Sequence, residues 1–147
     1  MKIKQLSLFL ENKPGHLSAI CRSLADARIN IATLSLADTQ QFGILRLIVE
    51  NWEKARDVLE KVGFVVNVTD VVATEVDDKP GGLADILGIL EKGSFNIEYM
   101  YAFSVRRDQK AVLVFRFDDP DAAIKRLADG GRNVLASVDL FPKNAKK

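Results

Sequence analysis

The chain has 147 residues, of which 48% are hydrophobic and 28% are charged, and its mean hydropathy is +0.02. This composition is typical of a folded globular protein and excludes a disordered or membrane-embedded chain. Lysine and arginine (21 residues) nearly balance aspartate and glutamate (20 residues), so the net charge of +1 creates no field that would gather a polyanion. We therefore expect neither a nucleic acid nor a membrane as a partner.

The first half of the sequence predicts the order strand, helix, strand, strand, helix, strand. The strands show period-two alternation, with Leu6, Leu8 and Leu10 on one face of the first. The helices show apolar stripes, and Cys21 falls within the first stripe, so we expect it in the core. The predicted strands cover 3–10, 29–37, 42–50 and a segment from about 64, with a polar hairpin connection at 38–41, and the predicted helices cover 17–25 and 52–62.

The second half repeats this pattern at an offset of 66 residues. Lys13-Pro14-Gly15 returns as Lys79-Pro80-Gly81, Asn30-Ile31 returns as Asn96-Ile97, and eight of the 19 positions over this stretch are identical. Near Gly130-Gly131 the phase slips by one or two residues. The predicted strands cover 70–77, 95–105, 110–117 and 133–141, and the predicted helices cover 80–92 and 119–129. We infer an internal duplication.

The order βαββαβ with two helical crossovers predicts a four-stranded antiparallel sheet with both helices on one face. The fold class is therefore α+β, with two ferredoxin-like modules at 1–68 and 69–142 and a disordered tail at 143–147. One face of each sheet lacks helices, and we expect another module to bury its apolar side chains. The apolar strand residues assigned to this face are Ile31, Ala37, Tyr99, Tyr101 and Phe103.

The turn between the first strand and the first helix of each half suits an anion. Proline fits the first helical position, glycine permits close approach by a ligand, and the free N–H groups of a helix N-terminus attract a carboxylate. Asn12 and Asn30 each offer an amide that donates to a carboxylate or accepts from an ammonium group. Helix capping and turn formation are the alternative roles of these asparagines.

The segment from Asn12 to Ile31 resembles the ACT domain, a module that binds amino acids and controls metabolic enzymes. The motif Glu11-Asn12-Lys13-Pro14-Gly15 followed by Asn30-Ile31 carries this resemblance. It is closest to the regulatory ACT domain of phosphoglycerate dehydrogenase, where the two corresponding asparagines hold serine across a dimer interface. The resemblance covers nearly the whole chain as two ACT modules and implies ligand roles for Asn12 and Asn30.

The chain departs from that family member at two places, which argues against serine as the ligand. Asp78 stands where Asn12 stands in the first copy, and Leu10 and Val76 replace a histidine that contributes to the effector site. The candidate ligand-binding residues are Leu10, Asn12, Pro14, Gly15, His16, Leu17, Asn30 and Ile31 in the first copy and Asp78, Gly81, Gly82, Leu83, Asn96 and Ile97 in the second.

These observations predict a cytoplasmic regulatory protein that binds a free amino acid between ACT modules and modulates its own assembly or a metabolic enzyme or regulator. We expect a homodimer, because sheets with exposed apolar faces and open edges tend to pair. We expect no cofactor, no metal and no catalytic activity, because His16 and Cys21 are the only residues of their types and no catalytic motif is present. The main alternative is a ligand-free interaction module. An RNA-binding module of the same element order would need aromatic residues on the open sheet face, for which Phe115 and Phe117 are the candidates.

Overall fold

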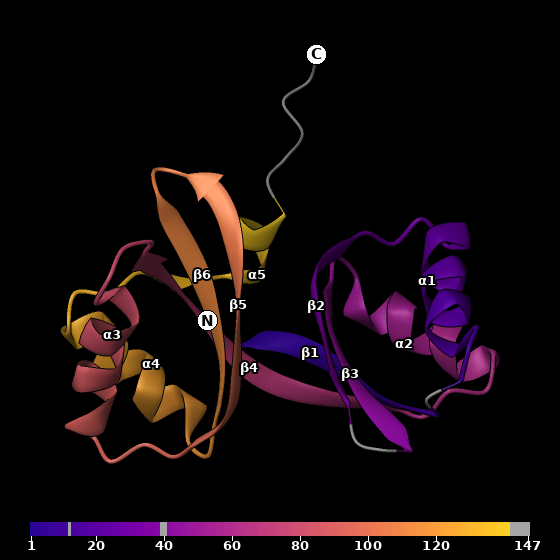
Figure 1. Cartoon of the computed structure of the whole chain (residues 1–147), viewed down its shortest axis with the longest axis horizontal. Helices are drawn as coiled ribbons and strands as arrows, with labels where there is room; N and C mark the ends of the chain where they lie inside the picture. Colours follow the sequence, from indigo (N-terminus) through magenta and orange to yellow (C-terminus); the bar gives the residue numbers. More distant parts are fainter. Residues whose placement is uncertain (12, 39–40, 142–147) are drawn as a thin grey trace. The chain divides into compact units, whose positions relative to one another are not determined.

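The structure is a computed structural model that describes residues 1–11, 13–38 and 41–141, with the side chains of 38 and 104–107 left out (Figure 1). Asn12, the centre of the predicted hairpin connection and the predicted tail at 143–147 lie outside the described residues. The first six elements are β1 (Ile3–Glu11), α1 (His16–Asp26), β2 (Ile31–Asp38), β3 (Phe42–Val49), α2 (Trp52–Lys61) and β4 (Val66–Asp77). The other six are α3 (Gly82–Glu91), β5 (Ile97–Arg107), β6 (Lys110–Phe117), α4 (Pro120–Asp129), β7 (Val134–Leu135) and α5 (Ser137–Leu140).

The chain divides into two compact units, and β4 contributes to both. One unit is Lys4–Thr69, and the other is Met1–Ile3 together with the chain from Asp70 onward. The sequence predicted two separate strands near this boundary, but β4 is a single strand of 12 residues. It contains neither glycine nor proline and is rich in valine and threonine, so no residue in it favours a break.

In the first unit, β3 lies between β1 and β2 and pairs antiparallel with both. Leu6 lies opposite Leu47 and Leu8 opposite Leu45, and all four side chains point toward the helices because directly opposed residues share a face. Both helices cover this one face (Figure 1). The buried core consists of Leu6, Leu8, Leu10, Ile20, Leu24, Ile29, Leu45, Leu47, Val49, Ala55 and Leu59.

In the second unit, β6 lies between β4 and β5, and β7 pairs with β4. Phe115 and Phe117 are fully buried, and their rings stack with centroids 5.2 Å apart. Both belong to the core that includes Ile86 of α3 and Leu127 of α4, so they lie beneath the helices. They are therefore unavailable to stack on bases, which removes the basis of the RNA-binding alternative.

The predicted strand at 133–141 is wrong. The chain forms the two-residue strand β7 and then the short helix α5. The Asp139 carboxylate accepts a hydrogen bond from the backbone N–H of Ala136 at 2.7 Å, which satisfies a donor at the start of α5. Aspartate disfavours a strand and favours a helix N-terminus, so this local contact ends the sheet.

The phase slip between the two copies lies in the hairpins, earlier than predicted. The starts of β2 and β5 differ by 66 residues, whereas the starts of β3 and β6 differ by 68. The offset is still 68 at the left-handed glycines Gly63 and Gly131, which have φ angles of 96° and 79°. Two additional residues in the second hairpin account for the slip.

Some predicted burials are also different. Cys21 is half-buried rather than part of the core, and Val62, expected on the inner face of α2, has an exposed fraction of 54%. Ile31 lies opposite Val49 on the helix side of its sheet, where it packs against the first core. Tyr99 and Tyr101 lie on the helix-free face, as predicted. They are opposite Arg116 and Val114 of β6, whose side chains point away from the helices because they alternate with the buried phenylalanines.

Candidate functional site

The turn from β1 into α1 is shaped by Gly15, which has a φ angle of 90° in the left-handed region and forms the N-cap of the helix. The Lys13 N–H donates to the Glu11 carbonyl at 2.8 Å, and the Ala19 N–H donates to the Gly15 carbonyl at 2.9 Å. Only glycine adopts this backbone conformation without steric cost. Lys13-Pro14-Gly15 therefore forms a tight bend from which the helix starts directly.

The turn from β4 into α3 repeats this geometry. Gly81 has a φ angle of 90° and is the N-cap of α3. The Lys79 N–H donates to the Asp77 carbonyl at 2.9 Å, and the Asp85 N–H donates to the Gly81 carbonyl at 3.0 Å. The duplication has thus preserved both the turn residues and their hydrogen bonds.

No side chain among the described residues caps α1 or α3. The second helix of each module is capped, since Asn51 accepts from the Lys54 N–H at 3.1 Å and Asp119 accepts from the Ala122 N–H at 3.2 Å. Uncapped N–H groups in the first turn of a helix, together with the helix dipole, form a site for a carboxylate. The two glycine-bearing turns have this property, and the starts of α2 and α4 do not.

Each turn also carries an ion pair with the preceding strand. The Lys13 ammonium lies 2.9 Å from the Glu11 carboxylate, and the Lys79 ammonium lies 3.9 Å from the Asp77 carboxylate. The hydrogen bond from Lys13, with the charge of the same group, lowers the pKa of Glu11. Lys13 therefore offsets the negative charge of Glu11 beside the first turn.

The predicted site residues differ in accessibility. Pro14, Gly15, Asp78 and Gly81 are exposed, and so is Leu83, with an exposed fraction of 41%. The half-buried members are His16, Leu17, Ile31 and Ile97. The buried members are Leu10 and Gly82, of which Leu10 belongs to the first core. A ligand at either turn would therefore meet mainly backbone and the exposed turn residues.

Asn30 lies at the opposite end of its sheet from the turn. Leu10 at the end of β1 and Asp38 at the end of β2 both pair with Gly43, so β1 and β2 are parallel and end at the same side of the sheet as the turn. Ile31 at the start of β2 pairs with Val49 at the other side, and Asn30 directly precedes it. The Asn30 side-chain oxygen accepts from the Ile31 N–H at 3.0 Å, and its NH₂ group has no partner among the described residues. One module alone therefore does not bring its turn and Asn30 to the same ligand, and Asn96 occupies the corresponding place before β5.

The structure contains cavities that no sequence motif indicated. A cavity of about 500 Å³ in the first unit is lined by residues 28–29 and 50–54. A second cavity, of about 230 Å³, lies between α3 and α4, and a third, of about 90 Å³, adjoins Asp77. None of the three is lined by the turn residues 13–17 or 79–83. Within the described residues, no group of three metal-binding side chains occurs, and no helix has the length and apolar character needed to span a lipid bilayer.

A family model described as an ACT domain pair matches residues 1–140. The chain belongs to this ACT domain pair family. ACT domain pairs are regulatory rather than catalytic modules, and the two units with the order βαββαβ are its two ACT modules. The turn with the repeated Lys-Pro-Gly sequence is thus a feature of both ACT modules.

Several solved structures resemble this ACT domain pair. Protein BT0572 from Bacteroides thetaiotaomicron is 41% identical, with 97% of each chain covered and a TM-score of 0.90. The ligand-free regulatory subunit of aspartate kinase from Thermus thermophilus is 16% identical, with 86% of this chain and 91% of that chain covered and a TM-score of 0.66. The corresponding subunit from Thermus flavus is 14% identical, with 87% of this chain and 92% of that chain covered and a TM-score of 0.60. The two aspartate kinase subunits share the fold of this chain. No curated protein matches the sequence.

Proposed function

We propose that this ACT domain pair is a cytoplasmic regulatory protein that binds a free amino acid and has no catalytic activity of its own. The observation that carries the proposal is the glycine-bearing turn, present in both modules, whose helix N-terminus has no side-chain cap among the described residues. Such a turn binds the α-carboxylate through backbone N–H groups. The regulatory subunits of aspartate kinase with the same fold support a role in controlling a metabolic enzyme or regulator.

The proposed site is shared by two copies of the chain. Since Asn30 and the first turn lie at opposite ends of one sheet, a ligand that contacts both needs a second copy in the reverse orientation. An antiparallel pairing of β2 with β2 of a second copy would place Asn30 of one copy beside the turn of the other. The NH₂ group of Asn30, for which the described residues offer no acceptor, would then donate to the ligand.

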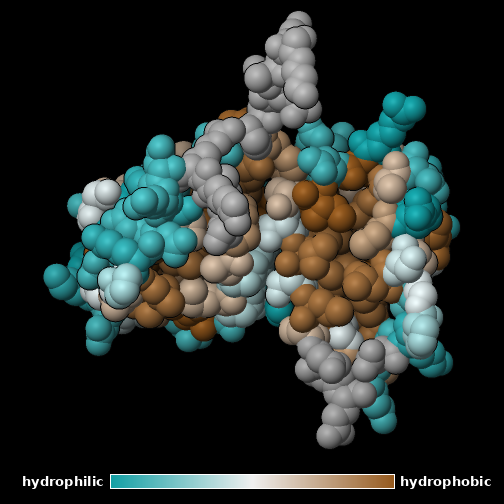
Figure 2. Space-filling view, turned by 45° about the horizontal axis from the view of Figure 1, so that its top comes forward, coloured by the Kyte–Doolittle hydropathy of each residue, from teal (hydrophilic) through white to brown (hydrophobic). Residues whose placement is uncertain are grey.

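The edge strand β2 favours such a homodimer. It pairs only with β3 among the described strands, and it carries no charged residue between Ile31 and Ala37. Leu34 and Leu36 have exposed fractions of 45% and 48%. Figure 2 shows a continuous hydrophobic area where Figure 1 places β2 and β3. A strand edge without charge or proline is open to pairing with another strand.

The first test is a thermal-shift screen of the twenty amino acids against the full chain. A ligand that binds only the folded protein, present at 100 times its Kd, adds about 2.7 kcal/mol to the free energy of unfolding. The melting temperature of the protein should therefore rise clearly. Asn12→Ala and Asn30→Ala should lose this rise while keeping the melting temperature of the free protein. Asn67→Ala, which changes an exposed asparagine of β4 away from the turns, is the matched control and should keep it.

The assembly is tested by Leu36→Lys, which places a charge on the exposed strand edge. Light scattering should show a dimer for the unmodified chain and a monomer for the variant, and the variant should lose the amino-acid response. A screen in which no amino acid changes the melting temperature would reject the sensor and favour the alternative, a ligand-free interaction module.

A further inference from the structure

The cavity of about 500 Å³ in the first module lies where the connection from α1 to β2 meets the first turn of α2. Its volume is within the range of small-molecule sites. Charged side chains of both signs line it together with one aromatic ring: Arg28, Glu50, Trp52, Glu53 and Lys54. It is complete within one module, and it is separate from the two glycine-bearing turns.

The walls of this cavity are held by contacts within the module. The Lys54 ammonium donates to the Ala27 carbonyl at 2.8 Å, which ties α2 to the end of α1. The Arg56 guanidinium lies 5.4 Å from the centre of the Trp52 ring, at cation–π distance. The Glu50 N–H donates to the Asn30 carbonyl at 3.1 Å. The cavity is therefore preformed, as binding sites for small molecules usually are.

Three charged groups on its lining have no partner in the part of the chain that the structure describes. Lys54 uses its ammonium group on Ala27, but the Arg28 guanidinium and the carboxylates of Glu50 and Glu53 form no hydrogen bond or ion pair with any described residue. Among the described residues, one cation and two anions without a protein partner, all three exposed, thus line the same cavity. A ligand that carries one carboxylate and two cationic groups would match all three.

Arg28 occupies a backbone position that favours glycine. Arg28 follows α1 and has a φ angle of 58°. Its N–H donates to the Ala25 carbonyl, and the N–H of Ile29 donates to the Leu24 carbonyl. This is the left-handed C-terminal motif of helices, in which glycine is the common residue and other residues have a conformational cost. Arg28 therefore has a conformational cost at this position that glycine would not have.

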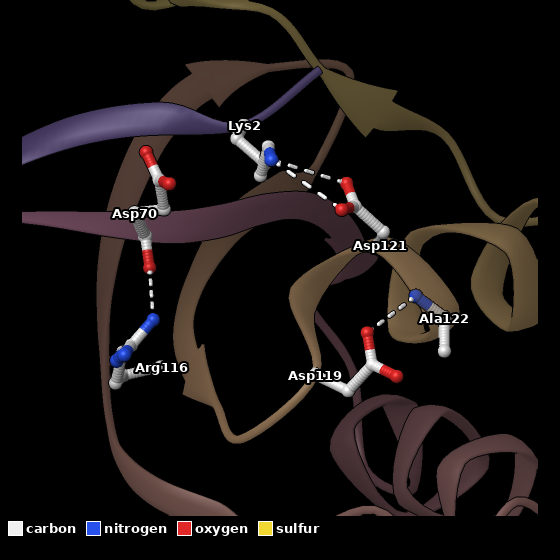
Figure 3. Close-up of polar contacts among 6 residues, drawn as sticks. All are labelled: Lys2, Asp70, Arg116, Asp119, Asp121 and Ala122. Atoms are coloured by element: carbon white, nitrogen blue, oxygen red, sulfur yellow. Dashed lines mark hydrogen bonds and ion pairs between the residues drawn. The ribbon is translucent and has the colours of Figure 1, made fainter.

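The second module shows that the fold does not require these side chains. Ser94, with a φ angle of 55°, takes the place of Arg28, and Pro120 and Ala122 take the places of Trp52 and Lys54. The carboxylates that correspond to Glu50 and Glu53 are already bonded there, since Asp118 accepts from the Asp119 N–H at 3.0 Å and Asp121 pairs with Lys2 at 3.3 Å (Figure 3). The same backbone therefore forms without the cations and the aromatic ring.

We propose that the Arg28 cavity is a second small-molecule site of the first module, and that it binds a diamino acid. Arg28 binds the α-carboxylate, Glu50 and Glu53 bind the two ammonium groups, and the ring of Trp52 contacts the aliphatic chain. The site uses one copy of the chain, so it does not depend on the proposed dimer or on the turns. Each of the two proposals is therefore tested without the other.

The experiment is titration calorimetry of the full chain with three probes of similar length. L-lysine has all three charges, L-norleucine lacks the side-chain ammonium group, and cadaverine lacks the carboxylate. We expect L-lysine to bind at least tenfold more tightly than either of the others. Equal affinities for the three probes, or no binding of L-lysine at millimolar concentration, would overturn the proposal.

Substitutions locate the binding. Arg28→Gly should weaken L-lysine binding at least tenfold, and its melting temperature should equal or exceed that of the unmodified chain, because glycine relieves the strained φ angle. Glu53→Gln should also weaken binding. Arg22→Ala and Glu60→Gln change exposed residues of α1 and α2 outside the cavity and should leave the affinity unchanged.

The monomeric variant Leu36→Lys separates the two sites. L-lysine binding that persists in this variant and is lost in Arg28→Gly supports the cavity. L-lysine binding that is lost in Leu36→Lys and persists in Arg28→Gly places the ligand at the shared turn site, which overturns the cavity proposal and leaves the proposed function intact.

Discussion

Lys13 shows how a single residue of the first turn sets the charge of its surroundings. Its ammonium group donates to Glu11 at 2.9 Å and lowers the pKa of that carboxyl group. A lowered pKa means that the folded protein favours the ionised form, so the contribution of this pair to stability is present at neutral pH. It is lost as the pH falls through the lowered pKa of Glu11.

Lys13→Met should therefore raise the pKa of Glu11 toward the ordinary value for glutamate. The measurement is an NMR titration of the Glu11 side-chain carboxyl carbon. Lys79→Met removes the matching lysine of the second turn and should leave Glu11 unchanged. A Glu11 pKa that is the same with and without Lys13 would show that the ion pair is absent in solution.

At this scale the sequence predicted the chemistry better than the geometry. The Lys-Pro-Gly sequence marked Gly15 and Gly81 as places where a ligand could approach closely, but their left-handed conformation as N-caps was not predicted. Proline was expected at the first helical position, whereas Pro14 precedes the N-cap of α1. The accessibility of Leu10 and Gly82 could not be predicted, because it depends on the packing of α1 and α3 onto their sheets. Arg28 was missed because the residues of its cavity are far apart in the sequence, although an arginine after a predicted helix, where glycine is common, was a signal.

Helix α3 contains two glycines and is preceded by a third at its N-cap, and the three differ in what surrounds them. Gly81 has open space around it but a φ angle of 90°, so its constraint is conformational. A Cβ atom on Gly82 would overlap the carbonyl oxygen of Asp77, which is backbone and unable to move freely. Gly88 lies within the helix with open space and ordinary backbone angles. The first helix has His16 where α3 has Gly82, so the close approach to the strand is particular to the second module.

These differences predict an order of stability for three alanine variants. Gly88→Ala should raise the free energy of unfolding by about 0.5–1 kcal/mol, because alanine favours the helix. Gly81→Ala should lower it by about 1–2 kcal/mol through the left-handed conformation. Gly82→Ala should lower it further, because the backbone must shift. Urea denaturation of the three variants measures this order, and a neutral Gly82→Ala would contradict the close contact.

The elements themselves were predicted well where period and turn chemistry agree. The strand at 110–117 has the predicted bounds, and the helix at 119–129 begins one residue later than predicted, at Pro120 after the capping Asp119. The prediction failed where apolar alternation was the only signal. At 133–141 the alternation suggested a strand, but the contact between Asp139 and the backbone of Ala136 favours a helix. Near residue 66, the two predicted strands are one because nothing in the sequence interrupts them.

Over the whole molecule, the duplication has produced two hydrophobic cores that share no residue. Leu45 and Leu113 occupy corresponding positions on β3 and β6, and both are buried against the helices of their own unit. The sequence repeat predicted this correspondence, because apolar periodicity reports which residues face a helix. It did not predict that the copies would diverge in their cavities, since those depend on single substitutions such as Arg28 and Ser94.

Two matched core variants test whether stability is organised by unit. Leu45→Ala and Leu113→Ala each remove a buried side chain and leave a cavity, and each should cost about 2–5 kcal/mol. Because the two cores are made of different residues, Leu45→Ala should speed amide hydrogen exchange mainly in β1 and β3, and Leu113→Ala mainly in β5 and β6. Exchange measured by mass spectrometry on both variants separates the two patterns. If each variant speeds exchange equally in all of these strands, the two cores open as a single cooperative unit, and the duplication has left the modules without separate stability.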